Sequence, residues 1–292
     1  MMSRIAYVNG RYVPHSEASV HVEDRGFQFA DGVYEVVAVY KGQLIDEQGH
    51  LDRLERSLDE LRIAMPLARP ALAQILRRMV RLNLVREGLV YFQVTRGVAP
   101  RDFPFPFAAA PTLVITARNK KFPGRDVKAV TVITTPDQRW ARRDIKTVAL
   151  LPATLAKQKA KEAGAFEAWQ VDADGYVTEG ASSNAWIVTK DNVIVTREAD
   201  HNILRGITRM AIIEFAKENG FKFEERAFSV EEAQNAREAF VSSASTFVMP
   251  VWKIDNVAIS NGEIGPVGKT LRDAYFDAMD QLANDARTRS TD

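Results

Sequence analysis

Three separated features of the sequence supply a nucleophilic amine, an acid and a place for an anion. Lys146 precedes the apolar run Val148-Ala149-Leu150-Leu151, and Glu179 stands beside Gly180. Farther on, Gly206-Ile207-Thr208 begins a segment whose apolar residues recur at helical spacing. A lysine amine can form a Schiff base, a carboxylate can keep a ring nitrogen protonated, and the N–H groups of a helix start bind phosphate. Together these are the parts needed to hold pyridoxal phosphate.

Each feature also has an ordinary structural interpretation. Lys146 could be a solvent-facing lysine at a strand edge, Glu179 a surface glutamate beside a turn, and Gly206 the start of an unremarkable helix. A Schiff-base lysine must lose its proton, which burial and nearby positive charge favour. Arg142 and Arg143 precede Lys146 closely. On the polar side of a leucine-patterned helix, Arg53 is a candidate for balancing the phosphate charge.

Composition excludes several other kinds of chemistry. The 292 residues contain no cysteine, which rules out disulfides, thiolate catalysis and cysteine zinc sites. A net charge of +1 does not call for a nucleic-acid or membrane partner. No apolar run is long enough to span a bilayer, and we expect a cytoplasmic protein. The four histidines lack the pair spacing of a zinc site, so no metal is expected.

One further segment only partly matches a known phosphate-binding motif. The segment 262–270 resembles a phosphate-binding P-loop, but Glu263 stands where the first glycine is required. We expect this segment to cap the last helix instead. No Gly-x-Ser-x-Gly elbow exists for serine hydrolase chemistry.

The elements that must position these residues alternate between strands and helices. The sequence predicts a hairpin at Asn9-Gly10, strands over 33–40, 89–96 and 112–117, and helices over 47–62 and 70–85. In the second half it predicts a strand over 127–134, a strand-like run around Lys146, and helices over 152–163, 206–219 and 269–283. Two more hairpins are expected at Asp174-Gly175 and Asp191-Asn192. We expect a mixed α/β fold with a small N-terminal domain (1–118), a linker (119–125) and a large C-terminal domain (126–292).

At this point the residues carry a family resemblance. In order and spacing, Lys146, Glu179 and Gly206-Ile207-Thr208 resemble the class IV (fold type IV) pyridoxal-phosphate aminotransferases. The segments 24–36, 50–54, 91–97 and 155–158 resemble the D-amino-acid aminotransferases within that class. The resemblance extends over nearly the whole chain, from about Tyr7 to Phe276.

The resemblance implies roles for individual residues. Lys146 would carry the cofactor as a Schiff base and move the proton between the substrate Cα and the cofactor. Glu179 would pair with the pyridine nitrogen, Leu204 would pack on the ring, and Arg53, Ile207 and Thr208 would hold the phosphate. Ser183 and Ser245 are further candidates for contact with the cofactor. Tyr34 and Arg101 would bind the substrate carboxylate, with Arg101 supplied across a dimer interface. The family pattern is a homodimer of two-domain chains with the cofactor in the cleft between domains and the active site near the interface.

The sequence departs from this pattern at three positions. Phe103 stands where the D-amino-acid enzymes usually have a histidine, so one carboxylate contact is lost and the substrate rim becomes more apolar. Ala244 replaces a common phosphate-binding threonine, for which Ser243 or Ser245 could substitute. Phe247 stands where an acid is usual. These changes bear on the preferred substrate more than on transamination itself.

Three functions therefore stay open at this stage. The leading hypothesis is transamination between a D-amino acid, with D-alanine as the expected donor, and a 2-oxo acid such as 2-oxoglutarate or pyruvate. An alternative is an (R)-selective amine transaminase or a branched-chain aminotransferase of the same fold. A protein of another class would be a lyase or a non-catalytic relative that only binds the cofactor.

Overall fold

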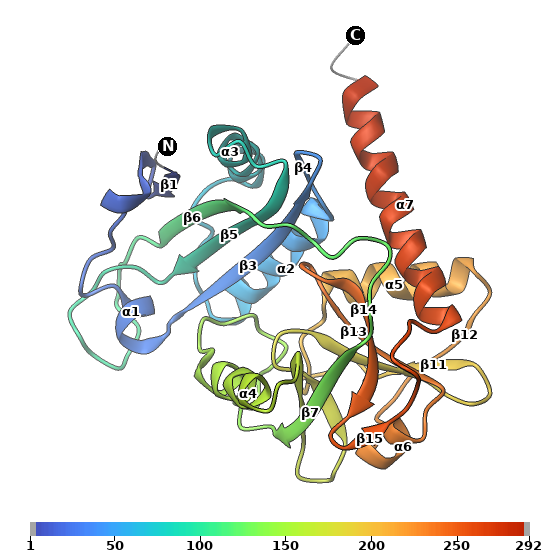
Figure 1. The fold of residues 1–292 in the computed structure, drawn as a ribbon. Helices are drawn as coiled ribbons and strands as arrows, with labels where there is room; N and C mark the ends of the chain where they lie inside the picture. The colour runs from blue at the N-terminus through green and yellow to red at the C-terminus, as the bar shows by residue number, and fades with distance from the viewer. Residues whose placement is uncertain (1–3, 289–292) are drawn as a thin grey trace. The chain divides into compact units, whose positions relative to one another are not determined.

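The computed structural model describes residues 4–288, which divide into two compact units (Figure 1). The first unit contains residues 4–122, 145–149 and 281–288, and the second contains residues 123–144 and 150–280. Each unit has its own sheet and its own helices, so the fold is mixed α/β as predicted. The break after Phe122 lies within the predicted linker 119–125, whereas residues 145–149, including Lys146, group with the first unit. The domain boundaries proposed from the sequence remain a prediction.

The first unit is built on a six-stranded sheet of order β2-β1-β6-β5-β3-β4, with every pairing antiparallel. Between β1 and β2, Asn9 and Gly10 have φ of 44° and 89°. Positive φ at both positions is what a tight hairpin loop requires, and the predicted hairpin is confirmed. The strands are β1 (Ile5–Val8), β2 (Arg11–Pro14), β3 (Gly32–Tyr40), β4 (Gln43–Leu44), β5 (Glu87–Thr95) and β6 (Thr112–Asn119).

Two amphipathic helices cover this sheet. Helix α2 (Glu47–Glu60) packs on β3, and α3 (Arg69–Leu82) packs on β1, β5 and β6. Leu51, Leu54 and Leu58 recur at helical spacing on α2 and are almost completely buried in the core of the unit. Both helices are confirmed, although each ends slightly earlier than predicted. Short helices η1 (His15–Glu17) and α1 (Arg25–Phe29) lie between β2 and β3 in the chain.

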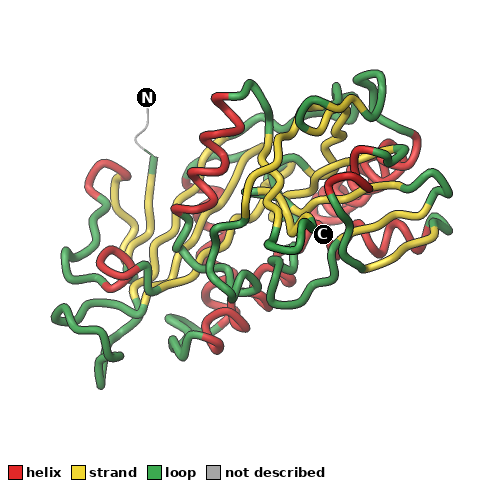
Figure 2. The backbone as a smooth tube through the Cα atoms, turned by 90° about the horizontal axis from the view of Figure 1, so that it is seen from below, coloured by secondary structure: helices red, strands yellow, loops and turns green. Residues whose placement is uncertain are grey.

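The second unit contains a nine-stranded sheet of order β12-β11-β10-β13-β14-β7-β8-β9, with β15 paired to β14. Its strands appear as yellow segments of the backbone tube in Figure 2, and β9 also contacts β10. Gly175 (φ 86°) and Asn192 (φ 62°) turn the two predicted hairpins, which are confirmed. The strands are β7 (Val130–Pro136), β8 (Glu167–Val171), β9 (Val177–Gly180), β10 (Asn184–Val188), β11 (Val193–Thr196), β12 (Lys222–Glu225), β13 (Glu238–Ser243), β14 (Phe247–Ile254) and β15 (Val257–Ala258).

Helices of the second unit pack on this sheet, and those predicted over 152–163, 206–219 and 269–283 are confirmed. Helix α4 (Leu151–Glu162) contacts β7 and β8, α5 (Ile207–Glu218) contacts β12 and β13, and α6 (Val230–Gln234) contacts β14. The hydroxyl of Ser229 accepts a hydrogen bond from the Glu232 N–H (3.0 Å), the N-cap interaction typical of this sequence pattern. Helix α7 (Pro266–Thr288) is longer than predicted at both ends.

The segment around Lys146 is not a strand, and that prediction was wrong. Only Thr147 forms an isolated bridge, to Val33 of β3. The Tyr34 N–H donates to the Lys146 carbonyl, and the Val148 N–H donates to the Gly32 carbonyl, both at 3.0 Å. Because β4 pairs only with Val39 and Tyr40, the other end of β3 has a free edge on which residues 146–148 dock. An apolar run in sequence does not distinguish such a docked loop from a strand.

The start of α7 explains the P-loop-like segment. The Val267 and Gly268 N–H groups donate to the Glu238 carboxylate at 3.1 and 2.9 Å. Gly265 lies so close that a Cβ there would meet the Glu238 Cδ at 2.1 Å. The segment therefore caps a helix, as expected, and its anion is an internal side chain.

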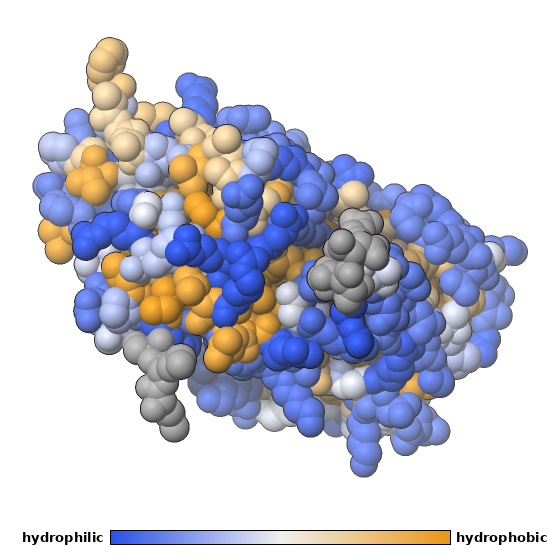
Figure 3. Space-filling view, turned by 90° about the horizontal axis from the view of Figure 1, so that it is seen from above, coloured by the Kyte–Doolittle hydropathy of each residue, from blue (hydrophilic) through white to orange (hydrophobic). Residues whose placement is uncertain are grey.

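Apolar side chains also reach the surface, where Figure 3 shows them in orange among hydrophilic residues in blue. In the first unit, Phe103 and Phe107 are fully or largely exposed, and so is Phe27. Within residues 4–288, no helix combines the length and the apolar composition needed to cross a membrane.

Candidate active site

Lys146 and Tyr34, two of the predicted site residues, lie together in the first unit. The Lys146 Nζ is 3.4 Å from the Tyr34 hydroxyl and 4.4 Å from the centre of its ring. Tyr34 in turn stacks on Tyr91, with ring centres 5.7 Å apart. Burial is the main cause, and the neighbouring Tyr34 the second, of a rise in the pKa of Tyr91 to about 12. Lys146 thus projects over an aromatic surface of the β3–β5 pair, where its amine has a hydroxyl partner.

Glu179 lies in β9 and is buried among hydrogen-bond donors. Its Oε1 accepts from the Leu204 N–H (3.0 Å), and its Oε2 accepts from the Asn184 amide (2.8 Å). The Arg139 guanidinium also donates to it. The structure therefore presents Glu179 as an acceptor fixed by an ion pair with Arg139 and two hydrogen bonds. Two predicted site residues, Glu179 and Leu204, are therefore in contact through the Leu204 backbone.

Arg139 is the site residue to which sequence reasoning assigned no role. Besides Glu179, it contacts Asp137 through Nη2 at 2.7 Å and Nε at 3.0 Å. Burial alone would lower the pKa of Arg139, but the charges of Glu179 and Asp137 outweigh it and raise the pKa. Burial likewise opposes ionisation of Asp137, and Arg139 holds the pKa of this carboxyl below its ordinary value. The alternation Asp137-x-Arg139 just after β7 was the available signal, since such spacing puts both side chains on one side of an extended chain.

The residues predicted to bind phosphate through their backbone form the start of α5. Gly206 is its N-cap in an extended conformation, and Ile207 and Thr208 form its first turn, both buried. A Cβ on Gly206 would meet the Asn184 Oδ1 at 2.0 Å, so any other residue here would require the Asn184 side chain to move. The Asn184 amide also donates to the Leu204 carbonyl (2.9 Å). Asn184 therefore ties the α5 start to the Glu179 carboxylate.

The predicted serines lie in two turns of the second unit. Ser183 donates to the buried carboxylate of Glu167 at 3.0 Å, as Ser182 does at 2.7 Å. In the turn before β14, the Ser243 and Thr246 hydroxyls are 2.8 Å apart, and the Ser245 N–H donates to the Ser243 hydroxyl (3.4 Å). A direct contact of Ser183 or Ser245 with the cofactor stays a prediction.

The turn before β14 is held by Arg272 of α7. This fully buried guanidinium donates to the carbonyls of Thr246 (2.9 Å), Val248, Pro123 (2.8 Å) and Gly124 (2.6 Å). Burial lowers the pKa of Arg272 to about 10. Phe247, where an acid was expected, is buried and stacks on Tyr275 of α7, with ring centres 5.2 Å apart. The departure at Phe247 therefore serves packing against α7.

Arg53 lies on α2 in the first unit, buried against Glu35 of β3. Its Nε and Nη2 each donate to a Glu35 oxygen at 2.7 Å, and the His50 Nδ1 lies 2.7 Å from the same carboxylate. Such a bidentate pair fixes the guanidinium in orientation. A phosphate role for Arg53 stays a prediction.

The Glu35 carboxylate links stability to pH. Burial opposes its ionisation, but Arg53 and His50 outweigh burial and lower the pKa of Glu35 from 4.5 to about 2. A carboxylate with a lowered folded-state pKa stabilises the fold fully above its unfolded pKa, and this stability is lost as the pH falls from about 4.5 toward 2. At about 1.4 kcal/mol per pKa unit, the contribution is about 3 kcal/mol.

We therefore expect Glu35→Gln to lower the free energy of unfolding by about 3 kcal/mol at pH 7, since it leaves Arg53 buried without its counter-charge. The difference from the parent should narrow as the pH falls to 3. Urea unfolding across this pH range measures the difference in free energy of unfolding. The control is Glu55→Gln, since Glu55 pairs with Arg69 on the surface. A difference that is the same at pH 7 and pH 3 would contradict the linkage.

Arg101 and Phe103 lie in the segment between β5 and β6, and both are exposed. The Arg101 guanidinium is 4.6 Å from the centre of the Phe29 ring, and the Phe103 ring is 5.7 Å from the same ring. The two predicted substrate residues therefore meet at Phe29 of α1.

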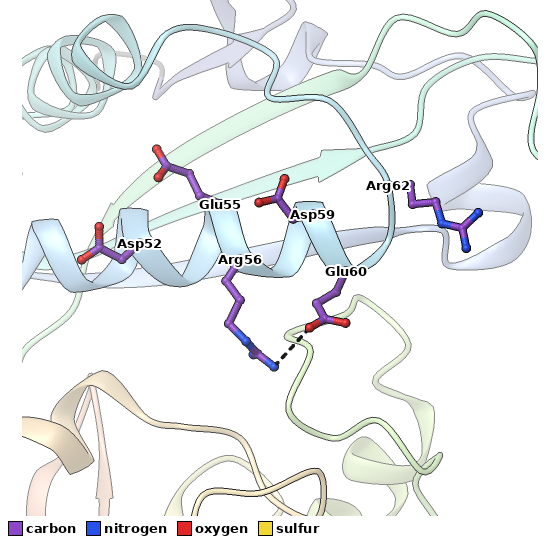
Figure 4. Close-up of a pocket in the computed structure, with 6 residues that line it drawn as sticks. All are labelled: Asp52, Glu55, Arg56, Asp59, Glu60 and Arg62. Atoms are coloured by element: carbon purple, nitrogen blue, oxygen red, sulfur yellow. Dashed lines mark ion pairs between the residues drawn. The ribbon is translucent and has the colours of Figure 1, made fainter.

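A surface pocket on α2 is unconnected with this chemistry. Figure 4 shows that its lining comes from α2 and Arg62 just beyond it, with Asp52, Glu55 and Asp59 on one side of the helix and Arg56 and Glu60 on the other. Asp52 and Glu55 form ion pairs with Arg69 (2.5 and 3.1 Å), and Arg56 lies 3.9 Å from Glu60. These are the paired charges of a solvated helix face.

Comparison with known proteins decides the family. The family described as Amino-transferase class IV matches residues 32–254. The chain belongs to the class IV aminotransferases. It is therefore a pyridoxal-phosphate-dependent enzyme of the α/β fold type IV.

The enzyme is similar to known relatives and solved structures over almost its whole length. It is 41% identical over 281 residues to a D-alanine aminotransferase of Bacillus licheniformis, covering 96% of this chain and 98% of that one. It is also similar to the branched-chain amino acid aminotransferase of Escherichia coli (TM-score 0.88, 25% identity, 94% of each chain). A second branched-chain amino acid aminotransferase, solved with pyridoxamine 5'-phosphate, matches with a TM-score of 0.87 and 27% identity, over 95% of this chain and 94% of that one.

The residues of the enzyme fit the cofactor. Lys146 supplies a primary amine on an aromatic surface, Glu179 a fixed anion, and α5 a helix start with a glycine N-cap. An amine, an anion and a helix start are the kinds of group that the aldehyde, ring nitrogen and phosphate of pyridoxal phosphate require.

Proposed function

We propose that the enzyme transfers the amino group between a D-amino acid, with D-alanine as the donor, and a 2-oxo acid such as 2-oxoglutarate or pyruvate. The observation that carries the substrate class is the 41% identity to a D-alanine aminotransferase over 96% of the chain. The sequence segments 24–36 and 91–97 support the same assignment. Bound pyridoxal phosphate supplies the electron sink for removal of the substrate α-proton.

Lys146 moves that proton. Its Nζ takes the proton from the substrate Cα and returns one to the cofactor side, which requires an amine that can be protonated and deprotonated in place. The Tyr34 hydroxyl at 3.4 Å orients the amine, and the docking of residues 146–148 on β3 fixes the lysine backbone. Tyr34 also offers its hydroxyl to the substrate carboxylate.

The residues of the second unit hold and polarise the cofactor. Glu179, kept anionic by Arg139, Asn184 and the Leu204 N–H, holds a proton on the ring nitrogen. The N–H groups of Ile207 and Thr208, the Thr208 hydroxyl and Ser245 bind the phosphate. Arg53 of the first unit supplies a counter-charge for it. Leu204 packs on the ring, and Ser183 supports the site through Glu167.

Arg101 and Phe103 form the substrate rim in this proposal. Arg101 binds the α-carboxylate across a homodimer interface, and Phe103 favours donors with apolar side chains. The exposed phenylalanines beside Arg101 support an interface at this segment. A cytoplasmic location also belongs to the proposal.

A second candidate is a branched-chain or (R)-amine transaminase. The similarity to two branched-chain aminotransferase structures and the apolar Phe103 favour it. The D-amino-acid assignment is preferred because the relative with that activity is more similar in sequence.

The visible absorbance of the purified enzyme distinguishes these candidates. The band of bound cofactor should bleach on addition of D-alanine and much less with L-leucine or (R)-1-phenylethylamine. Bleaching mainly with L-leucine or the amine would replace the substrate class and keep the family. A sedimentation measurement on the same sample tests the homodimer.

A further inference from the structure

Arg25, at the start of α1, is a buried arginine that holds the backbone next to Arg101. It is 3% exposed, and its Nη1 donates to the Asp102 carbonyl at 2.6 Å. Its Nη2 donates to the Phe103 carbonyl at 3.3 Å. These carbonyls belong to the two residues that follow Arg101, so the planar fork of Arg25 fixes the direction in which the segment leaves Arg101.

The remaining side of the Arg25 guanidinium is held by Asp31. The Arg25 Nε donates to the Asp31 Oδ2 at 2.8 Å, and Arg96 binds the same carboxylate through Nε (2.7 Å) and Nη2 (3.0 Å). Burial would raise the pKa of Asp31, but the hydrogen bonds from Arg96 and Arg25 outweigh it and lower the pKa. Arg96 also donates to the carbonyls of Leu61 (2.8 Å) and Arg62 (3.0 Å) after α2. Arg25 is therefore anchored through Asp31 and Arg96 to the body of the first unit.

Phe29 completes the arrangement from the same helix. Its ring centre is 4.6 Å from the Arg25 guanidinium and 4.6 Å from that of Arg101, and 5.7 Å from the Phe103 ring. Cation–π contacts of this kind orient an arginine without neutralising its charge. Arg101 is thus oriented by a ring, while its backbone is fixed by Arg25.

We propose that Arg25 is a positioning residue for substrate specificity, which holds the 101–103 segment so that Arg101 meets the carboxylate of the amino donor. This inference rests on the proposed function, in which Arg101 binds that carboxylate. Arg25 is too buried, and too fully engaged with Asp31 and two carbonyls, to bind substrate itself. Its replacement should therefore act on donors that carry a carboxylate and spare those that do not.

The test compares Arg25→Lys in the holoenzyme with the parent. Lysine keeps the positive charge, but its single ammonium group cannot donate to Asp31 and to both carbonyls at once. We expect the KM for D-alanine to rise about tenfold, with kcat within about twofold, because a displaced binding group costs affinity on this scale. Activity with (R)-1-phenylethylamine, or the kcat for D-alanine if the amine is not turned over, should change by less than about twofold. A fall in kcat as large as the rise in KM would overturn the proposal.

Arg69→Lys is the matched control, since Arg69 also pairs with carboxylates of the first unit and donates to a backbone carbonyl, that of Gln48. It should leave the KM for D-alanine unchanged. The double variant Arg25→Lys/Arg101→Ala should use D-alanine no worse than Arg101→Ala alone, because Arg25 acts through Arg101. Additive losses would show that Arg25 does not act through Arg101.

Limited proteolysis gives a readout independent of turnover. Chymotrypsin should cut after the exposed Phe107 several-fold faster in Arg25→Lys than in the parent or in Arg69→Lys, whereas Phe103 and Phe105 precede prolines and are not cleaved. Unchanged cleavage would mean that Arg25 does not hold the segment. A parent enzyme that does not use D-alanine would instead refute the proposed function, while this experiment would still decide what Arg25 holds.

Discussion

Replacing Lys146 with alanine is expected to abolish transamination, with turnover of D-alanine falling by at least about 10³-fold. Proton transfer by a positioned side chain contributes about 10²–10⁴-fold, and Lys146 also supplies the amine that attaches the cofactor. Its amine is positioned by the contacts that Lys146 makes with Tyr34 and β3, which another lysine could not reproduce. Initial rates with D-alanine and a 2-oxo acid, at saturating pyridoxal phosphate, measure the effect.

The control for this experiment is Lys190→Ala, in the turn between β10 and β11. It should bind cofactor and turn over D-alanine as the parent does. Far-ultraviolet circular dichroism should be unchanged in both variants, because neither lysine contributes to the core. Normal turnover in Lys146→Ala would remove this residue from the chemistry and reopen the choice of catalytic base.

Replacing Glu179 with glutamine is expected to lower turnover by about 10²-fold or more while the enzyme still binds pyridoxal phosphate. Glutamine keeps the shape of the side chain but not its charge, so the ring nitrogen loses the anion that keeps it protonated. The variant keeps Lys146 and the backbone N–H groups of the α5 helix start, so binding should persist. Rates of D-alanine use and cofactor titration by absorbance separate the two effects.

Glu263→Gln serves as the control for Glu179→Gln, since Glu263 lies at the surface before α7. It should change neither rate nor cofactor binding. The Glu179→Gln protein should also remain folded, because Arg139 retains its contacts with Asp137. A variant with full turnover would show that ring protonation does not depend on this carboxylate.

Local signals in the sequence predicted most elements of the fold. Asn9-Gly10 and Asp174-Gly175 supply the positive φ that tight turns need, and the leucines of α2 repeat at the helical period. These features depend on neighbours in the chain, which is why sequence alone could predict them. The segment at Lys146 was wrongly predicted as a strand because its docking depends on the free edge of β3, which is distant in the chain.

The same distinction holds for the site. The resemblance named Lys146, Tyr34, Glu179 and Leu204 as site residues, but it did not predict the contact of Lys146 with Tyr34 or that of Glu179 with Leu204. The bidentate pair of Arg53 with Glu35, and the contacts of Arg139 with Glu179 and Asp137, were not predicted. Each joins side chains from different elements, and their charges alone do not distinguish a buried pair from two solvated residues.

The Glu238 carboxylate at the start of α7 has a consequence for ligand selectivity. Because it is tethered to the same chain, it competes with free anions at an effective concentration on the order of millimolar or higher. The backbone N–H groups at the start of α7 are thus already occupied by the Glu238 carboxylate. A nucleotide phosphate would have to displace this carboxylate to bind there. The start of α5 has Gly206 as its N-cap, with no side-chain hydrogen bond capping its first turn among the described residues. One internal glutamate therefore makes the two helix starts of this unit differ in their ability to bind a free anion.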